Sequence, residues 1–227
     1  MAYTDTPPKE ALILFTRLPI PGQTKTRLMP WLTPEQCAAL HRAMLRDICG
    51  TLRRTGGDIF IFYTPKGDAA ELRQLCGEAS YLAQEGADLG ERMDRATREI
   101  LSRGYASCLL LGSDIPSVTE EDLGAARALL SKHDAVLAPT EDGGYWLVGL
   151  KGPCSSIFIH PYYGSARAFE AARRGCMQAN LSLALGAKLR DIDEIDDLRH
   201  YAAHPGTKMP YSQSLINRLT APGVKVI

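Results

Sequence analysis

The sequence of 227 residues has no net charge and no long apolar segment. Its 26 lysines and arginines are balanced by 26 aspartates and glutamates, so no overall positive field attracts nucleic acid or an anionic membrane. The apolar run near the N-terminus covers only residues 11–15, which is too short for a signal-peptide core or a membrane span. We therefore expect a cytoplasmic protein with neither nucleic acid nor membrane as partner, which holds any anion through a local cluster of side chains.

The cysteines do not form a recognisable metal or redox motif. They stand at positions 37, 49, 76, 108, 154 and 176, without a CxxC pair and without histidines at zinc-ligand spacing. The Walker A pattern GxxxxGKS/T is missing as well. The sequence thus gives no signal for a zinc site, a thioredoxin-type motif or a P-loop, and we expect free thiols in a reducing compartment.

Short apolar runs alternate with helix-compatible segments, a pattern typical of a mainly parallel sheet covered by helices. We expect strands at residues 11–15, 58–64, 81–83, 106–111, 135–138, 145–150 and 188–192. We expect helices at residues 34–54, 68–77, 88–102, from 119 onward, 165–174, 180–185 and 194–202. Because no repeat, low-complexity run or linker divides the chain, we predict one α/β domain over 1–227, with 204–227 as a C-terminal extension.

A cationic loop, residues 17–28 (RLPIPGQTKTRL), follows the first expected strand. Ligands of open α/β sheets bind beyond the carboxyl ends of the strands, so this loop lies where a ligand is expected. Its cations and hydroxyls are concentrated between two prolines and a glycine, which suits the wrapping of a polyphosphate. The residues concerned are Arg17, Gly22, Lys25, Thr26 and Arg27. The alternative is solvated surface charge.

Two acidic positions are candidate ligands for a divalent cation. Asp114 follows the uncharged strand at 106–111, and Mg2+ usually takes only one or two carboxylates from a protein. Asp193 shares one face of an extended segment with Asp191, and would complete the site if this segment ends beside Asp114. The alternatives are a turn cap for Asp114 and the N-cap of the following helix for Asp193.

The segment 138–150 (APTEDGGYWLVGL) contains a DGG turn between two apolar runs, which is typical of a hairpin or bulge. Paired glycines also allow the backbone to approach a ligand closely, and an aspartate there could bind an acceptor hydroxyl or take its proton. Tyr145 and Trp146 alternate faces, so one of them at most should contact ligand. The predicted substrate-binding residues are Asp142, Gly143, Gly144 and Tyr145.

Five ordered segments carry a family resemblance: FTRLPIPGQTKTRL, QEGADLGERM, LLLGSDIPSVTEEDL, APTEDGGYWLVGL and RDIDEIDDL. Over about residues 11–199 they resemble bacterial GT-A-type nucleotide-diphospho-sugar transferases. More distantly, the layout is similar to phospholactate and molybdenum-cofactor guanylyltransferases and to sugar-nucleotide cytidylyltransferases. The resemblance implies a Rossmann-like nucleotide-diphospho-sugar transferase fold, with a mixed, mostly parallel central sheet flanked by helices. It also implies that Lys25 and Arg27 hold phosphate and that Asp114 and Asp193 hold Mg2+ or Mn2+.

The second segment, QEGADLGER, matches the family pattern QxGxDLGxR. A glycine-bearing helix start can face a nucleotide, and an arginine there can add a phosphate contact. The predicted nucleotide-binding residues of this segment are Gln84, Gly86, Gly90 and Arg92. The alternative is a helix N-terminus capped by Asp88.

The chain departs from the family pattern in two places. Residues 162–165 (YYGS) occupy the place where the family carries Trp-Ser/Gly-Thr. The family's acceptor recognition therefore does not carry over to this chain. Residues 194–196 (EID) replace Thr-Pro-Glu and leave both expected metal carboxylates in place.

The resemblance implies a metal-dependent glycosyltransferase with a nucleotide-diphospho-sugar donor and an unknown acceptor. In that mechanism, the cation together with Lys25 and Arg27 neutralises charge on the leaving diphosphate, and Asp142 is the candidate base. The alternative is nucleotidyl transfer from a nucleoside triphosphate to a phosphorylated acceptor, with release of pyrophosphate. A second alternative is a non-catalytic nucleotide-binding protein. The sequence predicts no oligomeric state.

Overall fold

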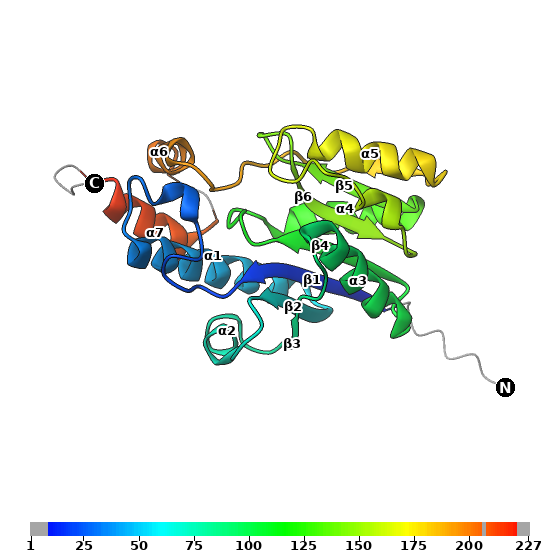
Figure 1. The fold of residues 1–227 in the computed structure, drawn as a ribbon, viewed down its shortest axis with the longest axis horizontal. Coiled ribbons are helices and arrows are strands. Elements are labelled where there is room, and N and C mark those ends of the chain that lie inside the picture. Colours follow the sequence, from blue (N-terminus) through cyan, green and yellow to red (C-terminus); the bar gives the residue numbers. More distant parts are fainter. Residues whose placement is uncertain (1–8, 206–207, 222–227) are drawn as a thin grey trace.

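The computed structural model describes residues 9–205 and 208–221 and contains a seven-stranded sheet with helices on both faces (Figure 1). The strands are β1 (Glu10–Arg17), β2 (Asp58–Thr64), β3 (Ser80–Ala83), β4 (Ser107–Gly112), β5 (Ala135–Pro139), β6 (Tyr145–Leu150) and β7 (Leu183–Leu185). Their order is β3-β2-β1-β4-β6-β5-β7, and β6 alone among these strands runs antiparallel to its neighbours. The predicted mixed, mostly parallel sheet flanked by helices is confirmed.

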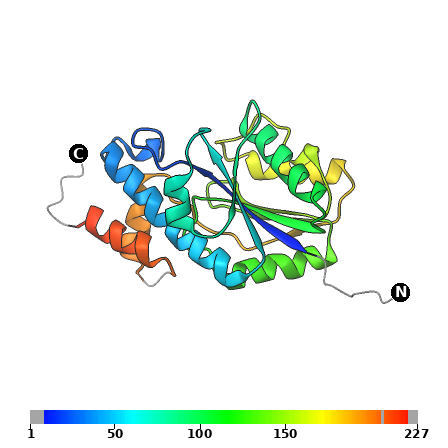
Figure 2. The same cartoon turned by 90° about the horizontal axis from the view of Figure 1, so that it is seen from below.

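The helices cover the sheet in two layers. They are α1 (Pro34–Thr55), α2 (Ala70–Cys76), α3 (Leu89–Ser102), α4 (Glu120–Lys132), α5 (Ala168–Gln178), α6 (Ile195–Ala203) and α7 (Pro210–Leu219), with short 3-10 turns η1 (Thr26–Leu28) and η2 (Ser155–Ile157). Apolar side chains of α1, α2 and α4 pack on one face, and those of α3 and α5 pack on the other (Figure 2). Among the described residues, no helix combines the length and apolar character that a membrane crossing requires.

Burial of the central strand β1 on both faces explains why polar and apolar residues do not alternate in its sequence. It lies between β2 and β4, and helices cover both of its faces. Leu12 and Leu14 pack toward α1, whereas Ile13 and Phe15 pack toward α3. A strand buried on both faces reads as a continuous apolar run. The run ends at the exposed Arg17, where the cationic loop begins.

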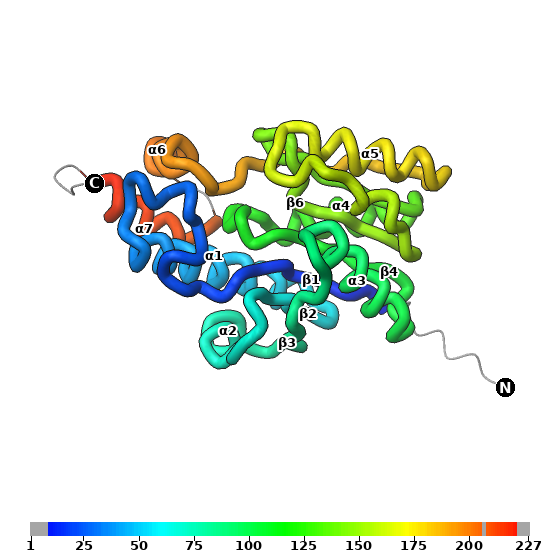
Figure 3. Tube along the Cα trace, viewed as in Figure 1, coloured from blue at the N-terminus to red at the C-terminus, as the bar shows by residue number. Residues whose placement is uncertain are grey.

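A separate helical cluster lies beyond the carboxyl edge of the sheet. It joins η1, the N-terminal half of α1, α6 and α7, and its buried residues are Leu28, Leu32, Cys37, Leu40, Met44, Ile192, Ile195, Leu198, Tyr201, Met209, Ile216 and Leu219. The buried carboxylate of Asp47 in α1 accepts hydrogen bonds from the N–H groups of Tyr211 and Ser212 in α7. This cluster anchors the two chain segments that carry Lys25 and Asp193 (Figure 3).

The C-terminal third differs from the sequence expectations. The helix expected at 180–185 is wrong: Asn180 adopts φ 53° after α5, and Leu183–Leu185 pairs in parallel with β5. The strand expected at 188–192 is reduced to one bridge between Thr140 and Leu189, because Ile192 leaves the sheet to pack in the helical cluster. Within the expected extension 204–227, residues 210–219 form α7 on α1, and residues 206–207 and 222–227 lie outside the described residues. All six cysteines are free, as expected.

Candidate active site

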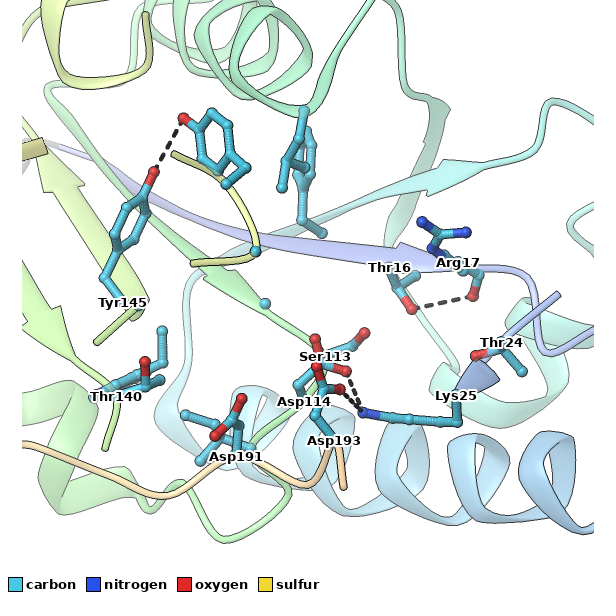
Figure 4. A pocket seen from close by; sticks show the side chains of 18 of the residues that line it. Thr16, Arg17, Thr24, Lys25, Ser113, Asp114, Thr140, Tyr145, Asp191 and Asp193 are labelled. Atoms are coloured by element: carbon cyan, nitrogen blue, oxygen red, sulfur yellow. Dashed lines mark hydrogen bonds and ion pairs between the residues drawn. The ribbon is translucent and has the colours of Figure 1, made fainter. Parts of the chain in front are cut away.

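A cavity of about 490 Å³ opens at the edge where the parallel strands end (Figure 4). Most of the predicted site residues line it: Arg17, Lys25, Thr26, Arg27, Gln84, Arg92, Asp114, Asp142, Gly144, Tyr145 and Asp193. They come from the last residue of β1, the first residue of β6, the loops after β1, β3, β4 and β5, helix α3, and the segment before α6. The strand-end rule thus brings most of the predicted residues to one cavity, and their role in binding stays a prediction.

Lys25 joins the two predicted metal carboxylates. Its Nζ donates hydrogen bonds to Asp114 Oδ1 at 2.5 Å, to Asp193 Oδ1 at 3.2 Å and to the carbonyl oxygen of Ile192 at 2.5 Å. The Lys25 side chain is 3% exposed, whereas those of Asp114 and Asp193 are 49% and 35% exposed. Two carboxylates from distant parts of the chain thus converge on one buried cation and keep oxygen atoms accessible from the cavity.

The charges of this cluster stabilise one another. Burial lowers the pKa of Lys25, but Asp114 and Asp193 outweigh it, so the pKa lies above the ordinary value and the ammonium stays charged. Burial raises the pKa of Asp114, but Lys25 outweighs it and holds that pKa below the ordinary value. The pKa of Asp193 is raised by burial and by Asp114, against the effect of Lys25. Lys25 and Asp114 are therefore an ion pair at neutral pH.

The backbone of Lys25 adopts the left-handed conformation, with φ 50° and ψ 41°. Residues other than glycine rarely adopt this conformation, and it persists where the surrounding structure enforces it. Here the three hydrogen bonds of the ammonium and the start of η1 fix the residue. Such strain is common at ligand sites, which agrees with the position of Lys25 in the cavity wall.

Three arginines add guanidinium groups to the cavity wall. Arg27 Nη1 lies 3.4 Å from Asp193 Oδ2, and half of the Arg27 side chain is exposed. Arg92 Nε donates to the carbonyl oxygen of Gly86 at 3.0 Å, and Arg17 Nη1 donates to that of Gln23 at 3.5 Å. Each guanidinium has five N–H donors, so these contacts leave donors available for an anion.

The end of the cavity beyond β5 carries acidic side chains. Asp142 Oδ1 accepts hydrogen bonds from the hydroxyl of Thr140 and from the N–H of Gly144, so this aspartate shapes the DGG turn between β5 and β6. Burial raises the pKa of the neighbouring Asp191 to about 7, with help from the charges of Asp142 and Asp193. Asp191, which is not among the predicted site residues, also lines the cavity. The hairpin interpretation of the DGG motif is confirmed, and Asp142 still faces the cavity.

Tyr145 and Trp146 lie on opposite faces of β6, as their alternation along the strand predicts. Tyr145 donates from its hydroxyl to that of Tyr163 at 3.2 Å, and both tyrosines line the cavity. Trp146 is 4% exposed, and its indole N–H donates to the carbonyl oxygen of Ala187 at 2.9 Å. Trp146 is therefore a core residue at the cavity floor, and Tyr145 is the side chain nearer to a ligand.

Four predicted ligand-binding glycines do not line the cavity: Gly22, Gly86, Gly90 and Gly143. A side chain at Gly90 would collide with the carbonyl oxygen of Phe158 and with the ring of Tyr163. A side chain at Gly143 would collide with the main chain of Ala166. Close packing of the loop between η2 and α5 explains these two glycines without a ligand.

The N-cap alternative for Asp193 is wrong. The N-cap of α6 is Glu194, and Asp197 accepts hydrogen bonds from the N–H groups of Asp193 and Glu194. The Asp193 side chain is thereby left to contact Lys25 and Arg27. By contrast, Asp88 does cap α3, as the alternative interpretation predicted.

Within 9–205 and 208–221, no three His, Cys, Asp or Glu side chains gather as a metal site, so protein ligands alone would not complete a coordination shell.

His41 is a cavity residue that sequence reasoning missed. It lies in α1, is 2% exposed, and its Nε2 lies 3.1 Å from both the Thr16 hydroxyl and the Arg17 carbonyl oxygen. Its Nδ1 has no partner in the described part of the chain. Burial, followed by the charge of Lys25, lowers the pKa of His41 to about 4, so the ring is neutral. A single histidine on an apolar helix face carries no sequence signal that separates it from an ordinary core residue.

The family model described as "Uncharacterized protein conserved in bacteria (DUF2064)" matches residues 48–165, which is just over half of the chain. The chain belongs to the DUF2064 family. Curated relatives of this DUF2064 protein are guanylyltransferases. The phosphoenolpyruvate guanylyltransferase of Chloroflexus aggregans is 30% identical over 185 residues, covering 79% of this chain and 91% of the relative. The 3-phospho-D-glycerate guanylyltransferase of Phenylobacterium zucineum is 28% identical over 190 residues, covering 80% and 85%.

Solved structures agree with the fold of the DUF2064 chain. A protein from Desulfovibrio desulfuricans G20, proposed to be a nucleotide-diphospho-sugar transferase, matches with a TM-score of 0.81 and 28% identity, covering 92% of this chain and 97% of that one. A CMP:2-keto-3-deoxy-manno-octonic acid synthetase matches with a TM-score of 0.56 at 9% identity, which supports the fold alone.

The comparisons confirm the predicted resemblance to nucleotide-diphospho-sugar transferases and guanylyltransferases. They also support the broader prediction of a transferase. They do not support the preference for glycosyl transfer, because the relatives named above are guanylyltransferases. The alternative prediction, nucleotidyl transfer, agrees better with them.

Proposed function

We propose that this protein is a divalent-metal-dependent guanylyltransferase, which moves GMP from GTP to the phosphate of a small phosphorylated acid and releases pyrophosphate. The observation that carries the proposal is the convergence of Asp114 and Asp193 on Lys25, beside the cationic loop after β1. A nucleoside triphosphate requires both features, a cation site and donors for phosphate oxygens. The guanine base and the phosphorylated acid come from the relatives.

The residues fit a bound Mg2+ or Mn2+. The oxygens of Asp114 and Asp193 already approach one cationic atom, Lys25 Nζ, at 2.5 and 3.2 Å. Both carboxylates are partly exposed to the cavity, where water and phosphate oxygens can supply the other ligands that Mg2+ needs. A metal ion held there would supply Lewis acidity and neutralise phosphate charge.

The chain's own residues bind the donor and stabilise the leaving group. Lys25, Arg17 and Arg27 hold the β- and γ-phosphates and offset the charge that develops on pyrophosphate. An oxygen of the acceptor phosphate forms a bond to the α-phosphorus while the bond from that phosphorus to the β-phosphate oxygen breaks. A phosphate monoester is largely dianionic at pH 7, because its second pKa is about 6. This acceptor therefore needs no general base, and Asp142 orients the acceptor instead of taking its proton.

A pyrophosphate-release assay tests this function. The protein is incubated with Mg2+, each of GTP, ATP, CTP and UTP, and each of phosphoenolpyruvate, 2-phospho-L-lactate and 3-phospho-D-glycerate. We expect pyrophosphate with GTP and at least one of these acids, and none without Mg2+. Release of a nucleoside diphosphate from a nucleotide-diphospho-sugar, with no pyrophosphate from any triphosphate, would instead establish glycosyl transfer. Nucleotide binding without either product would establish the non-catalytic alternative.

A further inference from the structure

The cationic loop after β1 lines the cavity only in part. Arg17 and residues 23–27 line it, whereas residues 18–22, the outer stretch of the loop, do not. Leu18 in the outer stretch is 7% exposed and packs in the core with side chains of α1 and α2. Its N–H donates to the carbonyl oxygen of Thr64 at 2.7 Å. The outer stretch therefore connects the cavity-lining part of the loop to the sheet and to two helices.

Two consecutive residues of α1 hold main-chain oxygens of this loop. His41 Nε2 lies 3.1 Å from the carbonyl oxygen of Arg17, and Arg42 Nη2 donates to that of Pro19 at 3.0 Å. Within the described part of the chain, the Pro19 oxygen accepts from no main-chain N–H of a turn or loop. Arg42 thus supplies the hydrogen bond that the local backbone does not.

The guanidinium of Arg42 is itself oriented by a carboxylate of α2. Its Nε donates to Glu71 Oε1 at 2.5 Å, so one rigid, planar group joins α1, α2 and the outer stretch. The side chains of Arg42 and Glu71 are 34% and 43% exposed, and neither lines the cavity. An ion pair this exposed contributes little to overall stability. We therefore expect its effect to be local, on the position of the loop.

From this arrangement we infer that Arg42 and Glu71 are positioning residues, which hold the cationic loop in the conformation that binds phosphate. The inference rests on the proposed function, in which Lys25 and its neighbouring arginines hold the phosphates of the nucleotide. A loop that is held in its binding conformation loses little freedom when the ligand arrives. Without Arg42 the outer stretch loses one of its attachments, and a diphosphate must order the loop as it binds. A nucleoside without phosphates does not depend on this ordering.

Isothermal titration calorimetry with GDP and with guanosine, both in Mg2+ and on the full chain, tests this role. Arg42→Met keeps the apolar stem and removes the guanidinium. We expect it to weaken GDP binding by about tenfold, the scale of a lost charge-assisted hydrogen bond, and to leave guanosine binding unchanged. Arg46→Met is the matched control, because Arg46 lies one turn further along α1 and its guanidinium is 5.5 Å from the ring centre of Tyr211. That variant should bind GDP as the wild-type protein does.

Glu71→Gln separates position from charge. It removes a negative charge near the loop, so electrostatic attraction alone would make GDP bind more tightly. If Glu71 orients Arg42, GDP should instead bind about threefold more weakly, the scale of one weakened hydrogen bond. In an Arg42→Met background, Glu71→Gln should have no further effect, because the group that it orients is gone. Should Arg42→Met fail to fold, Glu71→Gln alone still decides, because its two expected effects have opposite sign.

The outcomes separate this inference from the proposed function. Three results would overturn the positioning role: GDP binding that Glu71→Gln leaves unchanged or tightens, GDP binding that Arg42→Met leaves unchanged, or equal losses for GDP and guanosine in Arg42→Met. Each of them leaves guanylyl transfer standing if the wild-type protein still binds GDP more tightly than guanosine. If the wild-type protein binds the two equally, the inference fails together with the phosphate-binding role of the cationic loop.

Discussion

Lys25 Nζ lies 2.5 Å from Asp114 Oδ1, although 89 residues separate them in the sequence. The same ammonium contacts Asp193 at 3.2 Å, so it lies where the two carboxylates would hold a divalent ion. A metal ion that binds there must share these oxygens with Lys25 or displace it. The phosphates of a nucleotide offer the displaced ammonium a new partner, so we expect metal and nucleotide to bind together.

The first prediction concerns Asp114→Asn, which removes the charge of one carboxylate at nearly constant volume. The wild-type protein should bind GTP at least about tenfold more tightly in Mg2+ than in EDTA, and the variant should lose that difference, because a carboxamide is a poor ligand for Mg2+. Calorimetric titration with GTP in both buffers measures it. Asp196→Asn is the control, because Asp196 is 81% exposed and pairs with Arg199. An unchanged Mg2+ effect in Asp114→Asn would reject this ligand.

The second prediction concerns the phosphate contacts of Lys25. Lys25→Met should weaken GDP binding by about tenfold or more, the scale of a lost charge-assisted hydrogen bond, and should leave guanosine binding nearly unchanged. Equilibrium dialysis with both ligands provides the comparison. Equal losses for GDP and guanosine would show that Lys25 shapes the cavity instead of binding phosphate.

The third prediction is a pH dependence of stability that originates in His41. Burial and then Lys25 lower its folded-state pKa to about 4, whereas an unfolded histidine titrates near 6.5. Between pH 6.5 and 4 the unfolded chain binds a proton that the folded chain does not, so the free energy of unfolding falls as the pH falls. This contribution is about 3 kcal/mol at pH 4.

Urea denaturation of the wild-type protein and of His41→Gln between pH 7.5 and pH 4.5 isolates the effect. The variant should lose stability less steeply over that range, because glutamine takes up no proton. If the free energies of unfolding of the two proteins fall equally with pH, His41 does not titrate as its burial requires.

The fourth prediction concerns Gly90, in the first turn of α3. Gly90→Ala should lower the free energy of unfolding by about 1–3 kcal/mol, because its methyl group would overlap the carbonyl oxygen of Phe158 and the ring of Tyr163. Gly124→Ala in α4 is the matched control, since a methyl group there meets nothing within 4 Å. That variant should gain about 0.5–1 kcal/mol from helix propensity. Equal effects of the two substitutions in urea denaturation would contradict the packing assigned to Gly90.

Local patterns in the sequence predicted most of the sheet and part of the site. The run at 11–15 is apolar because β1 is buried on both faces, and the DGG turn fixes the β5–β6 hairpin. Asp114 was recognisable because a single charge follows an uncharged strand. Each of these signals lies within about ten residues of chain, where composition and period suffice.

Contacts between distant segments were not predictable in the same way. The local sequence of residues 180–185 predicts a helix, but pairing with β5 makes Leu183–Leu185 a strand. The contact between Lys25 and Asp193 depends on the helical cluster, which holds the chain segments of both residues. The neutral state of His41 depends on its burial beside Lys25. In each case the deciding interaction joins elements that the chain brings together only after folding.

Transfer of the α-phosphate tests the central claim most directly. GTP labelled at the α-phosphate is incubated with Mg2+ and the acceptor acid that the pyrophosphate assay selects, and the products are separated and counted. The wild-type protein should transfer label to the acceptor with an equal amount of pyrophosphate, Asp196→Asn should do the same, and Asp114→Asn should do neither. Label that stays in free guanine nucleotides with the wild-type protein, or that reaches the acceptor equally with Asp114→Asn, would contradict guanylyl transfer at this site.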